Sequence, residues 1–179
     1  MAVVDYLHNV PLFVGLTADD LQAIASCLGR RTFGKGVFIF HKGSPGQVMY
    51  IIQSGGVRIF SVSAMGQELT VTVYGPGDFF GELSILDGLP RSAGAVALET
   101  TLTLTLRRED LLHHLANQPR LALNLLQNLA LRLRYTCSNA EDMAGYLAVV
   151  AGANLLGFGI GLIIHHSIAR SRAARAVGR

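Results

Sequence analysis

The spacing of apolar and polar positions changes its period twice along this chain. The first 30 residues indicate helices, because apolar positions recur at helical spacing from Leu21 to Leu28, behind Thr17 and Asp20 in a capping-box pattern. Residues 32–107 instead form short runs rich in β-branched and aromatic residues, with Gly, Pro, Ser and Asp between them about every 8 to 12 residues. This rhythm predicts an antiparallel β-sandwich or barrel.

The helical period returns at about residue 108. Residues 108–118 predict a short helix, and a long helix is expected to begin near Pro119, which the first helical turn tolerates. The long helix carries an apolar stripe with steps of three and four residues: Leu126, Leu129, Leu133, Thr136, Ala140 and Met143. A stripe at this heptad period favours a partner helix, and the alternative is a helix packed on its own β-domain.

The C-terminal segment has a different composition. Residues 143–164 carry no charged side chain, and this segment is long enough to span a bilayer core of about 30 Å. Gly157 and Gly161 suit close helix contact in lipid. Several arginines follow from Arg170 onward, and such charges prefer the cytoplasmic side. Three interpretations stay open: a transmembrane segment, an apolar helix that does not span, or a degraded tail.

Composition excludes several classes of protein. Half of the 179 residues are apolar and 15% are charged, so a folded domain with a sizeable core is expected. The net charge of +3 does not by itself indicate a nucleic-acid partner. Cys27 and Cys137 lie far apart, which fits a reducing compartment and argues against a zinc site or a disulfide scaffold. His41 is the only histidine in the predicted strands, so a metal-dependent jelly-roll enzyme is not expected and no metal is predicted.

One segment, FFGELSILDGLPRSAGA over residues 79–95, fits neither period. A glycine such as Gly81 allows backbone amides to approach an anion closely, and Arg91 can pair with a phosphate while Ser92 donates its hydroxyl. Glu82 would suit such a site if it accepted hydrogen bonds from sugar hydroxyls. The chemistry therefore favours a sugar phosphate as ligand, and the alternative is a surface Glu–Arg pair beside a loop.

The block FGELSILDGLPRSAGAV resembles the phosphate-binding cassette of cyclic-nucleotide-binding domains, and residues 5–144 as a whole resemble the Crp/Fnr branch of that family. The resemblance implies a mainly β fold with flanking helices, a double-stranded jelly-roll barrel and a long C-terminal dimerisation helix. It implies that Glu82 accepts the ribose 2′-hydroxyl and that Thr136 contacts the purine. The resemblance also implies that the cyclic phosphate is held by Arg91 and Ser92, together with the backbone of Gly81 and Leu83.

The resemblance divides the chain into a sensor domain over residues 1–118, a dimerisation helix over 119–144, and an apolar helix with an Arg-rich tail over 145–179. It implies a non-enzymatic homodimeric regulator of transcription that responds to a cyclic nucleotide, with cAMP as the expected effector. The family usually continues into a helix-turn-helix domain, and none is visible here, so DNA as a partner stays open. The alternatives are a truncated regulator or a cytoplasmic sensor anchored in the inner membrane through residues 143–164.

Overall fold

The computed structural model describes residues 3–63 and 66–156, with side chains as far as residue 138. The chain divides into two compact units, residues 1–128 and 129–179. The first unit holds all of the strands and the shorter helices. Helix α5 (Pro119–Leu156) begins in the first unit and continues in the second.

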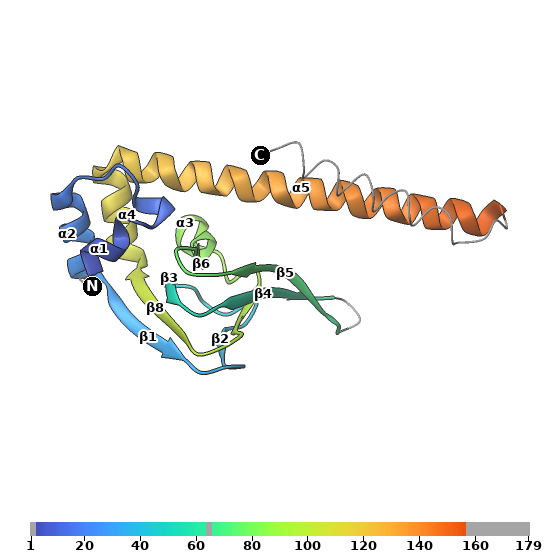
Figure 1. Cartoon of the computed structure of the whole chain (residues 1–179), viewed down its shortest axis with the longest axis horizontal. Helices are drawn as coiled ribbons and strands as arrows, with labels where there is room; N and C mark the ends of the chain where they lie inside the picture. The colour runs from blue at the N-terminus through green and yellow to red at the C-terminus, as the bar shows by residue number, and fades with distance from the viewer. Residues whose placement is uncertain (1–2, 64–65, 157–179) are drawn as a thin grey trace. The chain divides into compact units, whose positions relative to one another are not determined.

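Two four-stranded sheets form the β part of the described first unit (Figure 1). Their strand orders are β1-β8-β3-β6 and β2-β7-β4-β5, and every pairing is antiparallel. The strands are β1 (Gly29–Phe33), β2 (Phe38–Phe40), β3 (Val48–Ser54), β4 (Val57–Val62), β5 (Glu68–Tyr74), β6 (Phe79–Phe80), β7 (Gly94–Ala97) and β8 (Thr101–Arg107). The predicted jelly roll with flanking helices is confirmed, although hydrogen bonding closes neither sheet into a barrel.

A cluster of buried side chains joins the two sheets. Ile52 of the first sheet packs with Val57 and Ala95 of the second. The rings of Tyr50 and Phe80 stack in the same cluster, with centroids 5.1 Å apart. This cluster includes the start of the segment that the sequence marks as a ligand-binding cassette, because Phe80 of β6 belongs to both.

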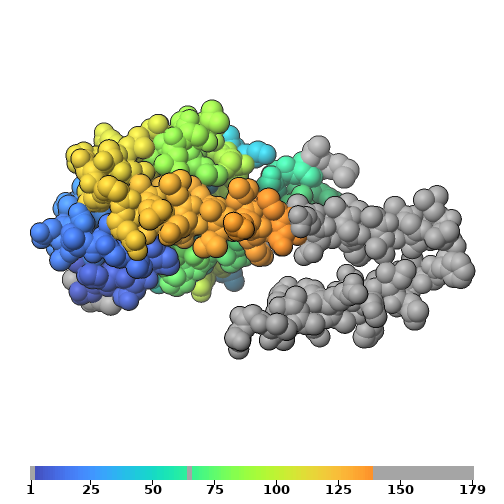
Figure 2. Space-filling model, turned by 90° about the horizontal axis from the view of Figure 1, so that it is seen from above, coloured from blue at the N-terminus to red at the C-terminus, as the bar shows by residue number. Residues whose placement is uncertain are grey.

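Short helices cover one end of the sheets: α1 (Val3–Leu7), the 3-10 helix η1 (Pro11–Phe13), α2 (Ala18–Cys27) and α4 (Arg108–Asn117). Figure 2 shows the blue N-terminal helices beside the yellow segment that contains α4. Thr17 and Asp20 form the predicted capping box at the start of α2. The first turns of α5 pack here too, since buried Asn124 donates to the carbonyls of Leu12 and Val14 at 3.0 and 2.8 Å.

The boundary between the first helices and the first strand differs from the prediction. Helix α2 ends at Cys27, and β1 begins at Gly29, inside the region whose pattern indicates helices. The sequence of β1, GRRTF, has no apolar alternation, and its strand conformation follows from pairing with β8. Tertiary pairing therefore decides the structure where local pattern is uninformative.

Helix α5 confirms the long helix that was expected from Pro119. No helix among the described residues is long and apolar enough to cross a membrane. The predicted apolar segment 143–164 runs past Leu156, so its last part, the glycine pair and the Arg-rich tail lie outside the described residues.

Candidate functional site

The cassette begins with a turn that only glycine fits well. Gly81 follows β6 with φ +81°, a left-handed conformation that side chains disfavour. A Cβ at this position would lie 2.6 Å from Nη1 of Arg91. The glycine therefore allows both the turn and the close approach of the arginine to the main chain.

Arg91 is buried under this turn and is held in a fixed orientation. Its Nη1 donates to the carbonyl of Gly81 and its Nη2 to the carbonyl of Val48, each at 2.6 Å. The guanidinium lies 4.2 Å from the centroid of the Phe40 ring, within the range of a cation–π contact. The remaining donor, Nε, is buried without a hydrogen-bond partner in the described part of the chain.

Glu82 supplies the opposite charge. The side chains of Glu82 and Arg91 are only 4% and 5% exposed, so this is no solvated surface pair. Burial lowers the pKa of Arg91, while nearby Tyr50 and Glu82 act in the opposite direction. Charges are costly to bury, which makes this arrangement a candidate for a site that handles a charged ligand.

A short helix and its clamps shape the rest of the cassette. Helix α3 (Leu83–Asp87) ends at Gly88, whose φ of +74° is left-handed, and the Asp87 carboxylate accepts from the amide of Leu89 at 2.8 Å. Arg108 donates to the carbonyl of Ser84 at 3.1 Å and also to the carbonyl of Ile85. These contacts hold the C-terminal end of α3 against the start of α4.

The loop that precedes β3 packs against the cassette residues Ser84 and Arg91. The amide of Gly43 donates to the carbonyl of Arg91 at 2.8 Å, and the amide of Arg91 donates to the carbonyl of Ser44 at 2.9 Å. Gly46 passes so close that a Cβ there would lie 2.5 Å from Cβ of Ser84 and 2.8 Å from Nε of Arg91. The loop over residues 43–46 thus packs tightly on the cassette.

The structure brings three of the predicted site residues together: Gly81, Glu82 and Arg91. Leu83 and Ser92 lie on the same segment with exposed side chains. Thr136 lies in the second unit, is exposed, and donates its hydroxyl to the carbonyl of Arg132 at 3.0 Å. Its contact with a purine therefore stays a prediction.

Sequence reasoning missed four residues that position the cassette: Phe40, Gly46, Val48 and Arg108. Arg107 ends β8 and Arg108 begins α4, and these two adjacent arginines lie in different surroundings. Arg107 is exposed, and its Nη1 lies 3.8 Å from Oε1 of Glu109, whereas Arg108 donates to a carbonyl of α3. No local signal distinguishes two adjacent arginines. Phe40 and Val48 contact Arg91 only through the folded arrangement of the strands.

Comparisons with known proteins agree with this geometry. Residues 30–118 match the cyclic nucleotide-binding domain family. The chain is 45% identical over 128 residues to the cyclic AMP receptor protein of Thermus thermophilus, a match that covers 72% of this chain and 59% of the relative. It is 34% identical over 139 residues to a CRP-like cAMP-activated global transcriptional regulator of Mycobacterium tuberculosis, with 78% of this chain and 62% of the relative covered.

Among solved structures, the catabolite activator protein of Thermus thermophilus matches with a TM-score of 0.69 at 42% identity. That match covers 75% of this chain and 63% of the other. The chain thus spans only 59% and 62% of the length of the two curated relatives. From its matched residues and its fold, the chain belongs to the cyclic nucleotide-binding domain family, in the Crp/Fnr branch.

Proposed function

We propose that this chain is the sensor part of a Crp-type transcription regulator, and that it binds cAMP in the cassette over residues 79–95. In this site Arg91 and Ser92 bind the cyclic phosphate, together with the backbone of Gly81 and Leu83. Glu82 accepts the ribose 2′-hydroxyl, and Thr136 contacts the purine. Relatives that are named as cAMP receptors support the choice of cAMP over other cyclic nucleotides.

The observation that carries the proposal is the buried guanidinium of Arg91. Each of its two Nη atoms donates one hydrogen bond to a main-chain carbonyl, while the Nε–H has no partner in the described residues. A buried donor without a partner costs about 1–3 kcal/mol. A ligand phosphate would accept from this arginine and offset that cost.

Signalling requires that the ligand bind one arrangement of the protein better than another. We infer that α5 carries the signal as a dimer helix over residues 119–144, because its stripe exposes apolar side chains. Leu126 is 63% exposed and Leu133 is 64% exposed. Exposed apolar stripes of this kind mark interaction surfaces.

Calorimetric titration of the full chain with cAMP and cGMP tests the ligand. We expect Arg91→Gln to lose about 2–5 kcal/mol of binding free energy, because the phosphate would then face a buried site without its cation. Arg58→Gln is the control, since Arg58 on β4 forms an ion pair with Glu68 on β5, outside the cassette. Equal cAMP affinity in Arg91→Gln and the parent would exclude the cassette as the phosphate site.

Arg91 also holds two carbonyls of the fold, so a second variant is needed. Ser92 has an exposed side chain, and removing its hydroxyl should leave the fold intact. Ser92→Ala should weaken cAMP binding by about one hydrogen bond to a charged group, 1.5–3 kcal/mol. If Ser92→Ala melts like the parent and binds cAMP equally well, the proposed contacts of the phosphate are incorrect.

A further inference from the structure

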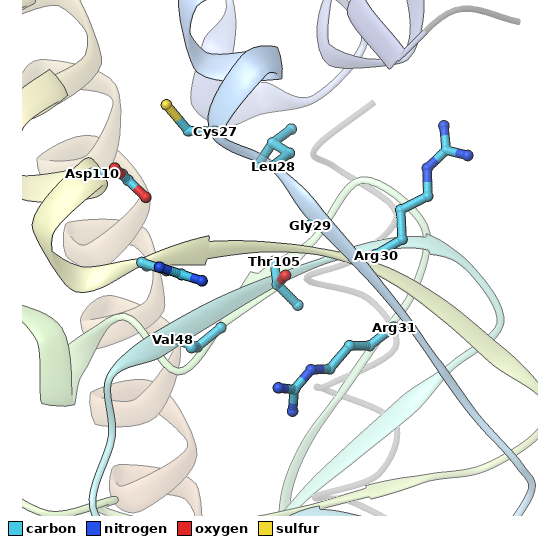
Figure 3. A pocket seen from close by; sticks show the side chains of 9 residues that line it. Cys27, Leu28, Gly29, Arg30, Arg31, Val48, Thr105 and Asp110 are labelled. Carbon is cyan, nitrogen blue, oxygen red and sulfur yellow. The ribbon is translucent and has the colours of Figure 1, made fainter.

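A second polar cleft lies outside the cassette, between β1, β8 and the start of α4 (Figure 3). It has a volume of about 460 Å³, and no residue of the cassette lines it. Six of its lining residues matter here: Cys27, Gly29, Arg31, Thr105, Arg107 and Asp110. Val48, whose carbonyl accepts from Arg91, also lines the cleft, but no residue proposed to contact the cyclic nucleotide does so.

The register of the β1–β8 ladder places two arginines on one face of the sheet. Gly29 pairs with Thr105 and Arg31 pairs with Thr103, and directly paired residues share a face. Arg107 is two residues beyond Thr105, so it lies on the same face. Along this face Thr105 therefore lies between Arg31 and Arg107, and Figure 3 shows Thr105 and Arg31 on neighbouring strands. Arg30 alternates to the opposite face of β1, although it also lines the cleft at its rim.

The hydroxyl of Thr105 is available to a ligand, unlike those of the two threonines before it on this face. The Thr101 hydroxyl lies 3.1 and 2.9 Å from the carbonyl oxygens of Gly56 and Glu99, which share its one proton, and Thr103 donates to the carbonyl of Arg31 at 3.2 Å. Thr105 makes no side-chain hydrogen bond within the described residues. Oγ1 of Thr105 occupies space that residue 29 leaves open, because a Cβ at Gly29 would lie 2.6 Å from it.

The charge around this hydroxyl is positive. Arg31 forms no ion pair with any residue that the structure describes. Arg107 has only a loose contact with Glu109 at 3.8 Å, and both side chains are about three-quarters exposed, at 74% and 76%, so water screens this pair. Asp110 is the single carboxylate among the lining residues, against three arginines, Arg30, Arg31 and Arg107.

We propose that this cleft is a second anion site, which binds a small phosphate-bearing ligand with two charged groups. Arg31 and Arg107 present planar forks of N–H donors from two sides, and the Thr105 hydroxyl donates from the floor between them. A tetrahedral phosphate accepts hydrogen bonds from all three directions. A cleft of this size has room for a second charged group beside the first. The proposal does not depend on the proposed function, because the cassette is not part of it.

The thiol of Cys27 gives a local readout, since it lines the same cleft and is half-buried. The experiment measures alkylation of the full chain by iodoacetamide, a neutral reagent, with peptide mass spectrometry. Inorganic diphosphate is the probe, and sodium chloride at matched ionic strength is the reference. We expect saturating diphosphate to slow alkylation of Cys27 about tenfold. The exposed thiol of Cys137 should keep its rate and serves as the internal reference.

Variants assign the effect to the cleft. Arg31→Gln and Arg107→Gln should each raise the half-protecting diphosphate concentration about tenfold, which is about 1.4 kcal/mol. Lys35→Gln removes the same charge from an exposed position that does not line the cleft, and it should leave that concentration unchanged. Thermal melting of each variant controls for folding, which these exposed side chains should not alter.

Four results would overturn the proposal. These are absence of protection by diphosphate, equal protection of Cys27 and Cys137, equal protection by chloride, and an effect of Lys35→Gln as large as that of Arg31→Gln. Succinate, a dicarboxylate, tests whether the cleft prefers phosphate groups to carboxylate groups. Protection by succinate at the same concentration as diphosphate would exclude a phosphate-specific site.

Discussion

Replacing Gly81 by alanine is the perturbation that most directly tests how the cassette is built. The residue has φ +81°, and a Cβ would lie 2.6 Å from Nη1 of Arg91 and 3.4 Å from the carbonyl oxygen of Val48. The left-handed backbone costs a side chain about 1–2 kcal/mol. The guanidinium must also move, although it is the far end of a long side chain.

That movement is costly because Arg91 is 5% exposed and bonded to two carbonyls. Losing one hydrogen bond to a charged group costs about 1.5–3 kcal/mol. Gly81→Ala should therefore lower the free energy of unfolding by about 2.5–5 kcal/mol in total. It should also weaken cAMP binding, since the displaced arginine no longer faces the ligand.

Gly36→Ala is the matched control. Gly36 has φ +78° and no heavy atom within 4 Å of an added Cβ, so it carries the backbone strain without the collision. Its expected loss is only about 1–2 kcal/mol. Urea unfolding followed by circular dichroism measures both variants, with the slope against urea checked for constancy. If the two variants lose the same stability, the arginine is not locked as described.

Two further predictions concern the helices. Leu129→Lys should place like charges opposite each other on the stripe of α5 and convert a dimer into monomers, as measured by sedimentation. Leu131→Lys, at an off-stripe position that is 66% exposed, should leave the dimer intact. A monomeric parent would contradict the dimer helix. Burial, and secondarily His113, lowers the pKa of His114, so the unfolded chain binds a proton there that the folded chain does not. The stability of the parent should therefore fall as pH drops below about 6.5, and His114→Gln should show a flatter dependence between pH 5 and 7 in thermal melts; an unchanged slope would show that His114 is not the group responsible.

Part of the fold and of the site is visible in the sequence because it depends on local chemistry. The capping box at Thr17 and Asp20 requires only residues three apart, and both side-chain bonds are present. The Gly81 turn is also local, since a glycine between a strand and a helical turn permits positive φ. For the same reason, the short apolar runs separated by turn residues predict the strands of the jelly roll.

The remaining features depend on register between distant strands, which periodicity cannot supply. Arg107 and Arg108 are adjacent and identical, yet only Arg108 reaches α3, because its amide bonds to Gln47 at 2.9 Å and fixes where β8 ends. Val48 accepts from Arg91 across 43 residues. These contacts become predictable only when the pairing of β3 with β8 is known.

The position of the cassette between the two sheets explains how a ligand could affect more than a loop. The segment enters from β6 in the first sheet and leaves into β7 in the second, so α3 is tied to both. Arg108, the first residue of α4, holds the end of α3 through two carbonyls. A shift of α3 when Arg91 binds a phosphate would therefore strain the bonds that connect it to α4. Helix α4 in turn leads through Gln118 into Pro119, where α5 begins, so the candidate site is connected to the start of α5 through covalent and hydrogen-bonded contacts within the first unit.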